Sequence, residues 1–549
     1  MKKLQLLAVL MLLLVGLQAQ SATKVEIVDV QETEIPILLD REDNELMRIR
    51  VDGTTSDTFQ EITLQFGKDT QMKYVESVKL YYSGTEAYEF RDKVRYRPVN
   101  YVESNSFTNP RAANLSYSVL QSESKSPGKK VTLKSKQKLF PGVNYFWVSI
   151  KMKRNAPLAT TKFTVKIDAV KISGSKVPVR MAQAEPVTHR VGLAVRTAGD
   201  DGVAAYRIPG LVTTKKGTLL GVYDIRHNSS VDLQEWVEIG LSRSTDGGQT
   251  WEPMRTPMSF DEEGGLPKAQ NGCGDPAILV DTKKGTIWIV AAWTHGEGNR
   301  RAWNNSQQGM SEYETAQLMM VKSTDDGKTW SKPMNFTEGL KDPEWWFLLQ
   351  GPGRGITMQD GTLVFASQYI GADRMPNAGI IYSKDHGKTW KISNYARTNT
   401  TESQVAEIEP GKLMLNMRDN RGGSRAVMTT TDMGKTWEEH ESSRSALQEP
   451  VCMASLISVN AKENVLKKDI LLFSNPNTTE GRHHITIKAS LDGGKTWPDE
   501  YQLLLDAEWG WGYSCLTMID KETIGILYEG STAHMTFQAV KLKDLINIK

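Results

Sequence analysis

One short pattern occurs five times in the sequence and constrains the fold more than any other feature. Its consensus is Ser/Thr-x-Asp-x-Gly-x-Thr-Trp, and the copies span residues 244–251, 323–330, 383–390, 430–437 and 490–497. The Asp side chain can accept hydrogen bonds from the backbone N–H groups of a turn, Gly supplies a positive φ, and Trp packs the turn onto neighbouring strands. The repeat therefore predicts a series of similar β-hairpin corners within one repetitive architecture.

Six apolar runs rich in strand-forming residues frame these corners. They begin at Gly217, Gly285, Gly361, Gly411, Asp469 and Thr523. Each follows another short run of the same kind, so the sequence predicts six hairpins. A repeating unit of about 50 to 75 residues has the size of a four-stranded propeller blade. We therefore expect an all-β fold in which residues 190–549 form a six-bladed β-propeller. The segment from Val191 is expected to supply the outer strand of the last blade and close the ring.

The N-terminal third of the chain has a different pattern. Lys2 and Lys3 precede an apolar run of 12 residues, whereas a membrane-spanning helix needs about 20, so residues 1–21 are expected to be a secretory signal peptide. The chain is then expected to be exported to the periplasm or secreted, without a membrane span.

Residues 22–175 alternate strand patterns with Ser, Gly, Asn and Pro clusters and are expected to form a β-sandwich. Residues 176–189 are expected to be the linker to the propeller.

Neither the charge balance nor the motifs of the sequence give a reason to expect a nucleic acid partner, a metal or a cofactor. Lys plus Arg number 67 and Asp plus Glu number 65, a balance that forms no basic surface by itself. Four corners contain Gly-Lys-Thr, but the earlier Gly of a phosphate-binding loop is missing from each. The adjacent His483 and His484 would point to opposite faces of a strand, and no further ligand cluster accompanies them. The three cysteines lie far apart and predict no disulfide framework.

Polar residues gather at one end of the expected propeller. In each blade the first strand starts and the second strand ends on the same face, near the axis. The polar residues at or just before first-strand starts are Arg207, Asp275, Glu402 and Tyr513. Those at second-strand ends or in the loops beyond are Arg226, Asp232, Arg418 and Arg482. Because the corners all fall on the opposite face, the sequence predicts a functional site at the axial mouth and a structural role for the corners.

The Arg-Ile-Pro motif at residues 207–209, together with the five Asp-containing corners, resembles the exo-α-sialidases (neuraminidases). The resemblance covers residues 190–549. It implies a retaining hydrolase that removes terminal sialic acids from glycoproteins, glycolipids or oligosaccharides. It also implies that Arg207, Arg418 and Arg482 clamp the carboxylate of the sugar, a task for which a guanidinium fork is better suited than an ammonium group.

The same resemblance assigns roles to the remaining residues. Tyr513 matches the nucleophile and Glu402 its base, whereas Asp232 matches the acid and base at the leaving oxygen. Arg226 and Asp275 resemble groups that bind the hydroxyl and N-acyl region of the sugar. A neutral phenol is a reasonable nucleophile here, because a carboxylate would approach the substrate's own carboxylate as a like charge. We expect partial burial to keep Asp232 protonated for long enough to donate.

Two other functions remain open. A non-catalytic glycan-binding propeller would not need the complete set of site residues, and a trans-sialidase or intramolecular trans-sialidase of the same fold would differ only in its product. The sandwich is a candidate carbohydrate-binding domain, and residues 190–549 alone are expected to keep activity on small sialosides. Six tryptophans are candidates for either the pocket wall or the core: Trp293, Trp303, Trp345, Trp346, Trp509 and Trp511.

Overall fold

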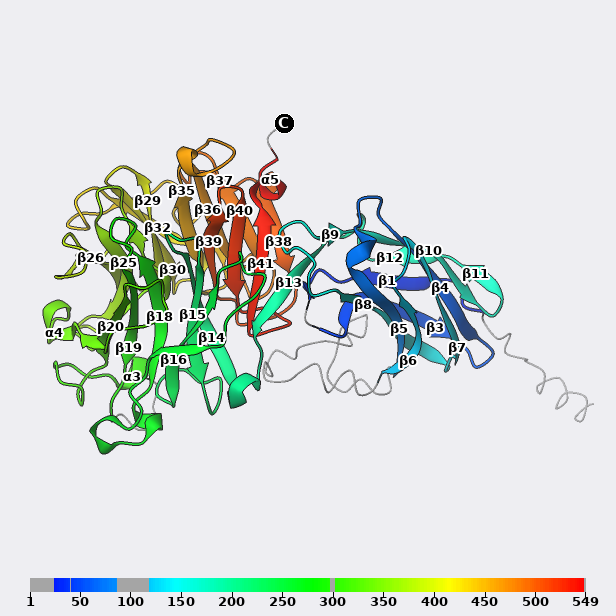
Figure 1. The fold of residues 1–549 in the computed structure, drawn as a ribbon, viewed down its shortest axis with the longest axis horizontal. Coiled ribbons are helices and arrows are strands. Elements are labelled where there is room, and N and C mark those ends of the chain that lie inside the picture. Colours follow the sequence, from blue (N-terminus) through cyan, green and yellow to red (C-terminus); the bar gives the residue numbers. More distant parts are fainter. Residues whose placement is uncertain (1–23, 40, 86–117, 297–301, 548–549) are drawn as a thin grey trace, which may run out of the picture.

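The computed structural model describes residues 24–39, 41–85, 118–296 and 302–547, which form two β-rich domains side by side (Figure 1). The predicted signal peptide at residues 1–21 lies outside this part of the chain. Within the same ranges, no helix has the length and apolar character needed to cross a membrane. The helices of the described ranges are single turns: α3 (Ala302–Asn305), α4 (Thr337–Leu340), α5 (Leu542–Leu545), and the 3₁₀ turns η1 (Met72–Tyr74), η3 (Asp200–Gly202), η4 (Glu263–Gly265), η5 (Lys268–Gln270), η6 (Ala461–Glu463) and η7 (Asp499–Tyr501).

The first domain is the expected sandwich of two sheets. One sheet has the order β12 (Val179–Met181), β1 (Val28–Glu32), β3 (Asn44–Gly53), β8 (Gly142–Met152), β5 (Val75–Thr85), β6 (Val119–Lys125). The other has the order β11 (Ser175–Val177), β10 (Val165–Ile172), β4 (Thr58–Phe66), β7 (Lys130–Lys138). Strand β7 alternates buried Val131 and Leu133 with exposed lysines, as a half-buried strand requires. Between the sheets, Phe59 of β4 stacks on Phe146 of β8 with 4.2 Å between ring centroids.

The second domain consists of six blades in the described residues, each an antiparallel sheet around a common axis. The first three blades are β14 (Ala205–Thr213), β15 (Leu219–Arg226), β16 (Val237–Ser244), β17 (Arg255–Met258); β18 (Cys273–Val280), β19 (Ile287–Trp293), β20 (Gln317–Ser323), β21 (Met334–Asn335), with β23 (Gly353–Arg354) added in parallel; and β22 (Phe347–Gln350), β24 (Ile356–Thr357), β25 (Leu363–Ile370), β26 (Pro376–Ser383), β27 (Lys391–Ile392), β28 (Arg397–Thr398). The next two are β29 (Thr400–Glu409), β30 (Lys412–Asp419), β32 (Ala426–Thr430), β33 (Glu438–Glu439); and β35 (Ser455–Val459), β36 (Ile470–Pro476), β37 (Ile485–Ser490), β38 (Gln502–Asp506). A small ribbon of β31 (Gly423–Ser424) and β34 (Gln448–Glu449) connects blades four and five.

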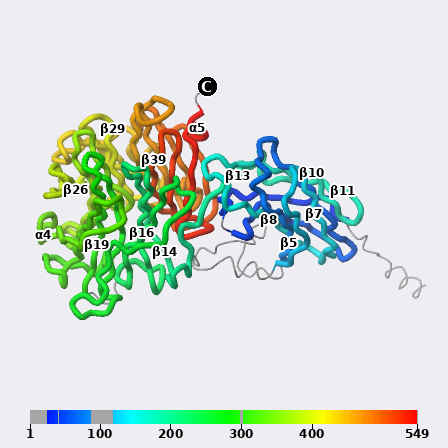
Figure 2. The backbone as a smooth tube through the Cα atoms, in the orientation of Figure 1, coloured from blue at the N-terminus to red at the C-terminus, as the bar shows by residue number. Residues whose placement is uncertain are grey.

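The last blade combines the two ends of the propeller sequence. It contains β39 (Ser514–Asp520), β40 (Thr523–Tyr528), β41 (Met535–Lys541) and β13 (His189–Arg196). Strand β13 pairs antiparallel with β41 through Leu193 opposite Phe537, which confirms the predicted closure of the ring. The same strand is also paired by β2 (Ile37–Leu38) and β9 (Lys162–Phe163) of the first domain. It therefore belongs to both domains and joins them, as Figure 2 shows.

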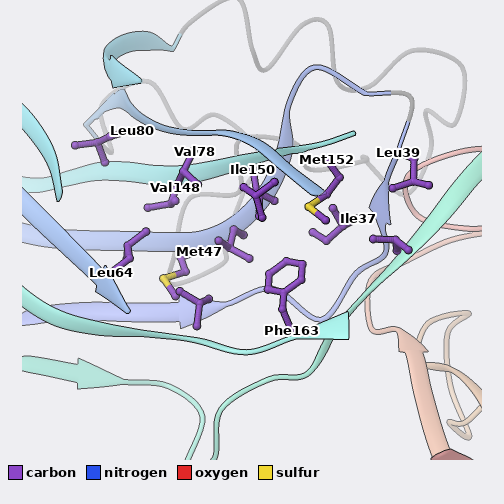
Figure 3. Packing of buried hydrophobic residues seen from close by; sticks show 14 of the residues in the cluster. Ile37, Leu39, Met47, Leu64, Val78, Leu80, Val148, Ile150, Met152 and Phe163 are labelled. Carbon is purple, nitrogen blue, oxygen red and sulfur yellow. The ribbon is translucent and has the colours of Figure 1, made fainter. Parts of the chain in front are cut away.

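The two domains also share one continuous hydrophobic core. Ile37 and Phe163 from the sandwich belong to the same buried cluster as Leu193 and Phe537 from the last blade. Figure 3 shows Ile37 and Phe163 packed among sandwich side chains such as Ile150 and Met152. The boundary between the domains is therefore a packed interface.

The predicted linker at residues 176–189 is partly wrong. Strand β11 overlaps its start and β12 lies inside it. They pair with β10 and β1 respectively, so the sandwich continues to Met181. The cause is a tight hairpin at Ser173 and Gly174, whose φ angles are 48° and 83°, as a two-residue turn between β-strands requires. The prediction relies on Pro178, Pro186 and a weak apolar pattern, but Pro178 lies between the two strands, and its carbonyl accepts the N–H of Val28.

The corner repeats are structural, as predicted. In the first corner the Asp246 carboxylate accepts the hydroxyl of Ser244 at 2.8 Å and the N–H of Thr250 at 2.9 Å, and the Ser244 hydroxyl accepts the N–H of Gly248. The other corners repeat this network around Asp325, Asp385, Asp432 and Asp492. The three cysteines are free and buried.

Candidate active site

A cavity of about 430 Å³ lies at the end of the propeller where the first strands begin. Five of the eight predicted site residues line it: Asp232, Asp275, Glu402, Arg418 and Tyr513. The other three, Arg207, Arg226 and Arg482, are held next to these residues by direct contacts. The fold thus brings all eight residues to the axial mouth, although they come from five different blades.

Tyr513 and Glu402 form the closest pair in the cavity. The Tyr513 hydroxyl donates to one oxygen of Glu402 at 2.5 Å, and Arg418 Nη1 donates to the other at 2.6 Å. Arg418 Nη1 also lies 3.2 Å from the Tyr513 hydroxyl. Burial and, after it, the charge of Glu402 raise the pKa of Tyr513 well above its usual value, whereas Arg418 lowers it. The phenol is therefore neutral and hydrogen-bonded to the carboxylate that would accept its proton.

Arg207 forms a buried ion pair with a glutamate that the sequence analysis missed. Glu529, with no exposed side chain, accepts Arg207 Nε at 2.6 Å and also the backbone N–H of Ile208 and Tyr513 at 2.9 and 3.0 Å. The guanidinium of Arg207 lies 5.3 Å from the centroid of the Tyr513 ring and 4.8 Å from that of Trp511. Glu529 therefore positions an arginine and the backbone of the tyrosine at once.

Arg482 completes a ring of three arginines around Tyr513. It reaches the site from the loop after β36, and its two terminal nitrogens donate to the carbonyls of Trp511 at 3.1 Å and Val451 at 3.3 Å. Its guanidinium carbon lies 5.6 Å from the Tyr513 ring centroid. Arg207, Arg418 and Arg482 thus face one small volume beside the tyrosine, which suits the binding of a carboxylate.

Asp224 is a second buried carboxylate that the sequence analysis missed. It lies within β15, accepts Arg226 Nη2 at 2.9 Å, and accepts the backbone N–H of Asp275 at 2.8 Å. Arg226 is 1% exposed and also donates Nη1 to Asp232 at 2.7 Å. In this structure Arg226 therefore contacts protein groups and does not line the cavity. Burial, followed by the charge of Asp224, raises the pKa of Asp275 well above its usual range.

Asp232 stands on a loop at the mouth, close to two arginines. Its carboxylate oxygen lies 2.7 Å from Arg226 and 3.9 Å from Arg207. The side chain is 58% exposed, so most of it lies in solvent and the expected partial burial of this residue is wrong. The reason is its position on the loop after β15, which opens toward solvent.

One wall of the cavity is apolar. It is lined by Leu233, Ala302, Phe347 and Leu349. These residues belong to a buried cluster that combines side chains of the first three blades, and Trp303 and Trp346 pack against this cluster. Of the six candidate tryptophans, Trp303 lines the cavity. Trp293 and Trp345 stack on Phe260 and Tyr369 in the core, whereas Trp509 remains 41% exposed. Across the described ranges no cluster of three or more His, Cys, Asp or Glu side chains could hold a metal ion.

Comparisons with known proteins identify the family to which the chain belongs. Residues 25–176 match a family described as the N-terminal domain of BNR-repeat neuraminidase, and residues 208–522 match a BNR repeat-like domain. A sialidase from Bacteroides fragilis is 64% identical over 94% of this chain and 95% of its own. The solved Hadza microbial sialidase Hz136 has a TM-score of 0.90 at 60% identity, covering 94% of this chain and 100% of its own. The intramolecular trans-sialidase from Ruminococcus gnavus shares the fold, with a TM-score of 0.54 at 20% identity over 64% of this chain and 97% of its own.

Proposed function

Because the chain belongs to the BNR-repeat sialidase family, we propose that it is an exo-α-sialidase that hydrolyses terminal sialic acids with retention of configuration. One observation carries the mechanism: the Tyr513 hydroxyl is hydrogen-bonded to Glu402 at the centre of three arginines. A lectin would have no use for a buried phenol hydrogen-bonded to a carboxylate in this way. The complete set of residues therefore supports catalysis over simple glycan binding.

The arginines would bind the carboxylate of sialic acid. Arg207, Arg418 and Arg482 carry three positive charges, and Glu529 and Glu402 already neutralise two of them. A bound carboxylate would balance the third, and its charge-assisted hydrogen bonds would fix the anomeric carbon beside the Tyr513 hydroxyl. The apolar wall with Trp303 and Phe347 suits the methyl of the N-acetyl group.

Two displacements at the anomeric carbon would then give retention. In the first, the Tyr513 oxygen forms a bond to this carbon as its proton passes to Glu402, and Asp232 donates a proton to the departing glycosidic oxygen. In the second, Asp232 takes a proton from water, the water oxygen attacks the same carbon, and the proton returns from Glu402 to the released Tyr513 oxygen. Bound substrate would cover Asp232 and remove it from bulk water, and this would provide the burial that the carboxyl needs in order to stay protonated.

The substrates that we propose are sialylated glycoproteins, glycolipids and oligosaccharides. The family membership supports sialylated substrates in general, and the open mouth around Asp232 leaves room for an aglycone of any of these classes. We also propose that the protein is exported to the periplasm or secreted, since residues 1–21 have the pattern of a signal peptide.

A fluorogenic sialoside assay on the purified protein, followed by NMR of the products, tests the proposal. We expect release of free sialic acid that appears first as the α-anomer. An absence of turnover would refute the enzymatic function. Initial formation of the β-anomer would refute retention, and an anhydro sugar or a transfer product would favour an intramolecular trans-sialidase or a trans-sialidase.

A further inference from the structure

The loop between β38 and β39, residues 507–513, ends in the proposed nucleophile and is called the tyrosine loop below. We infer that the N-terminal sandwich positions this loop through an ion pair between Arg48 and Glu508, which makes Arg48 and Glu508 positioning residues for catalysis. The inference rests on the proposed role of Tyr513 and extends it to the first domain.

On its inner side, the tyrosine loop contacts the catalytic groups. The carbonyl of Trp511 accepts Arg482 Nη1 at 3.1 Å, and the N–H of Gly510 donates to the carbonyl of Arg482 at 2.9 Å. Gly512 has a φ of 89°, and a Cβ there would lie 3.1 Å from the Cβ of Arg482. The loop and Arg482 are therefore in close contact, and a shift of the loop would move the nucleophile and one arginine of the clamp together.

On its outer side, the same loop contacts the sandwich. Arg48 Nη1 lies 2.9 Å from the carboxylate of Glu508, and the N–H of Ala507 donates to the carbonyl of Glu34 at 2.8 Å. Arg48 is itself fixed, because it is 4% exposed within β3 and its Nε binds the fully buried Glu45 at 2.5 Å. The tyrosine loop is thus attached to a rigid strand of the other domain.

A second contact between the domains supports the same arrangement. Arg41 of the sandwich donates to the carbonyl of Thr532, which lies in the turn that follows Glu529. The Asp506 carboxylate, at the start of the tyrosine loop, accepts the hydroxyl and the N–H of Ser531 at 2.7 and 2.8 Å. The sandwich therefore contacts both segments that place Tyr513, since Glu529 accepts the backbone N–H of Tyr513.

The variant Glu508→Gln in the full chain tests this inference. Glu508 is 28% exposed, so its loss leaves Arg48 paired with Glu45 and creates no isolated buried charge. A displacement of about 1 Å at a reacting group costs up to roughly 10²-fold in rate, and we expect a partial displacement with a loss of about 5- to 20-fold in kcat/KM. The matched control is Lys162→Gln, which breaks an ion pair of 2.6 Å between the domains at Asp544, on α5. This control is expected to keep kcat/KM within about 1.5-fold, as is usual for an exposed pair.

Three further measurements separate positioning from simple stability. Glu508→Gln is expected to slow aryl sialosides and natural sialosides by the same factor, because the attack by Tyr513 is impaired and not the protonation of the leaving group. Arg48→Lys keeps a charge for Glu45 but lacks the fork to bridge both carboxylates, so it should reproduce the loss. The double variant should lose no more than the larger of the two single losses.

The inference would be overturned by unchanged kcat/KM in Glu508→Gln, by a loss equal to that of Lys162→Gln, or by additive losses in the double variant. A loss explained entirely by a lower melting temperature would also do so. Failure of the proposed function itself would look different, because the wild-type protein would then release no sialic acid. Failure of the nucleophile assignment would appear as an active Tyr513→Phe variant, measured in parallel.

Discussion

Replacing Arg207 by lysine tests the carboxylate clamp, because it keeps the charge and removes the fork. Arg207 donates Nε and Nη2 to Glu529, which leaves Nη1 to face the region of Asp232. The single ammonium of a lysine would stay with the buried Glu529, so the fold should survive while the substrate loses a partner. A hydrogen bond to a charged group contributes about 1.5 to 3 kcal/mol, and each 1.36 kcal/mol is a factor of ten in rate. We therefore expect kcat/KM to fall by about 10- to 150-fold.

The assay measures initial rates on a fluorogenic sialoside, with the melting temperature recorded for each variant. Arg255→Lys is the matched control, since Arg255 is 36% exposed and pairs with Glu252 in the first blade, outside the site. It should behave like the wild type. If Arg207→Lys keeps kcat/KM within about twofold while remaining folded, Arg207 does not bind the carboxylate, because the loss of a charged hydrogen bond would exceed that margin.

Three more predictions follow from the site and the domain interface. Tyr513→Phe removes the attacking oxygen and little volume, so a folded protein with severely reduced turnover is expected, and wild-type rates would contradict the nucleophile assignment. Asp232→Asn should slow natural sialosides by roughly 10² to 10⁴ but aryl sialosides far less, with a burst of phenol in stopped-flow traces. Equal losses on both substrates without a burst would indicate that Asp232 only orients the sugar. The sequence predicts that residues 190–549 alone are active, but this fragment lacks Ile37 and Phe163, which pack in the same core as Leu193 and Phe537. The core left open predicts an aggregated or inactive fragment, and a soluble, fully active fragment in a gel-filtration and activity assay would contradict this.

The repeats predicted the propeller well because they report directly on local geometry. Asp246 and its counterparts make hydrogen bonds within a few residues of themselves, so the corner is visible in the sequence. The position of strand starts and ends in a blade then placed residues as distant as Arg207 and Tyr513 at one mouth. Glu529 and Asp224 obey the same rule. Glu529 directly follows the apolar strand β40, and Asp224 lies near the end of the apolar strand β15, so neither stood out in the sequence as a polar site residue.

The contacts between the domains have no such local signal. Arg48 and Glu508 belong to different domains, and neither has a pattern that identifies its partner. The exposure of Asp232 is likewise a property of the loop conformation, which composition and spacing do not determine. The sequence could therefore predict which residues gather at the mouth, but not how the surrounding structure holds them.

The double pairing of β13 has a consequence for the order of assembly. This strand precedes the rest of the propeller in the chain, whereas its partner β41 is close to the C-terminus. Until β41 arrives, β2 and β9 can already hold β13 against the sandwich, so the first domain presents a template edge for the final strand. Pairing of such distant segments is slow, because the entropy of closing a long loop must be overcome before the contact forms. Because β13 is already held in place, only β41 has to find its partner for the ring to close. This shortens the time during which the unpaired edge of β13 is open to aggregation.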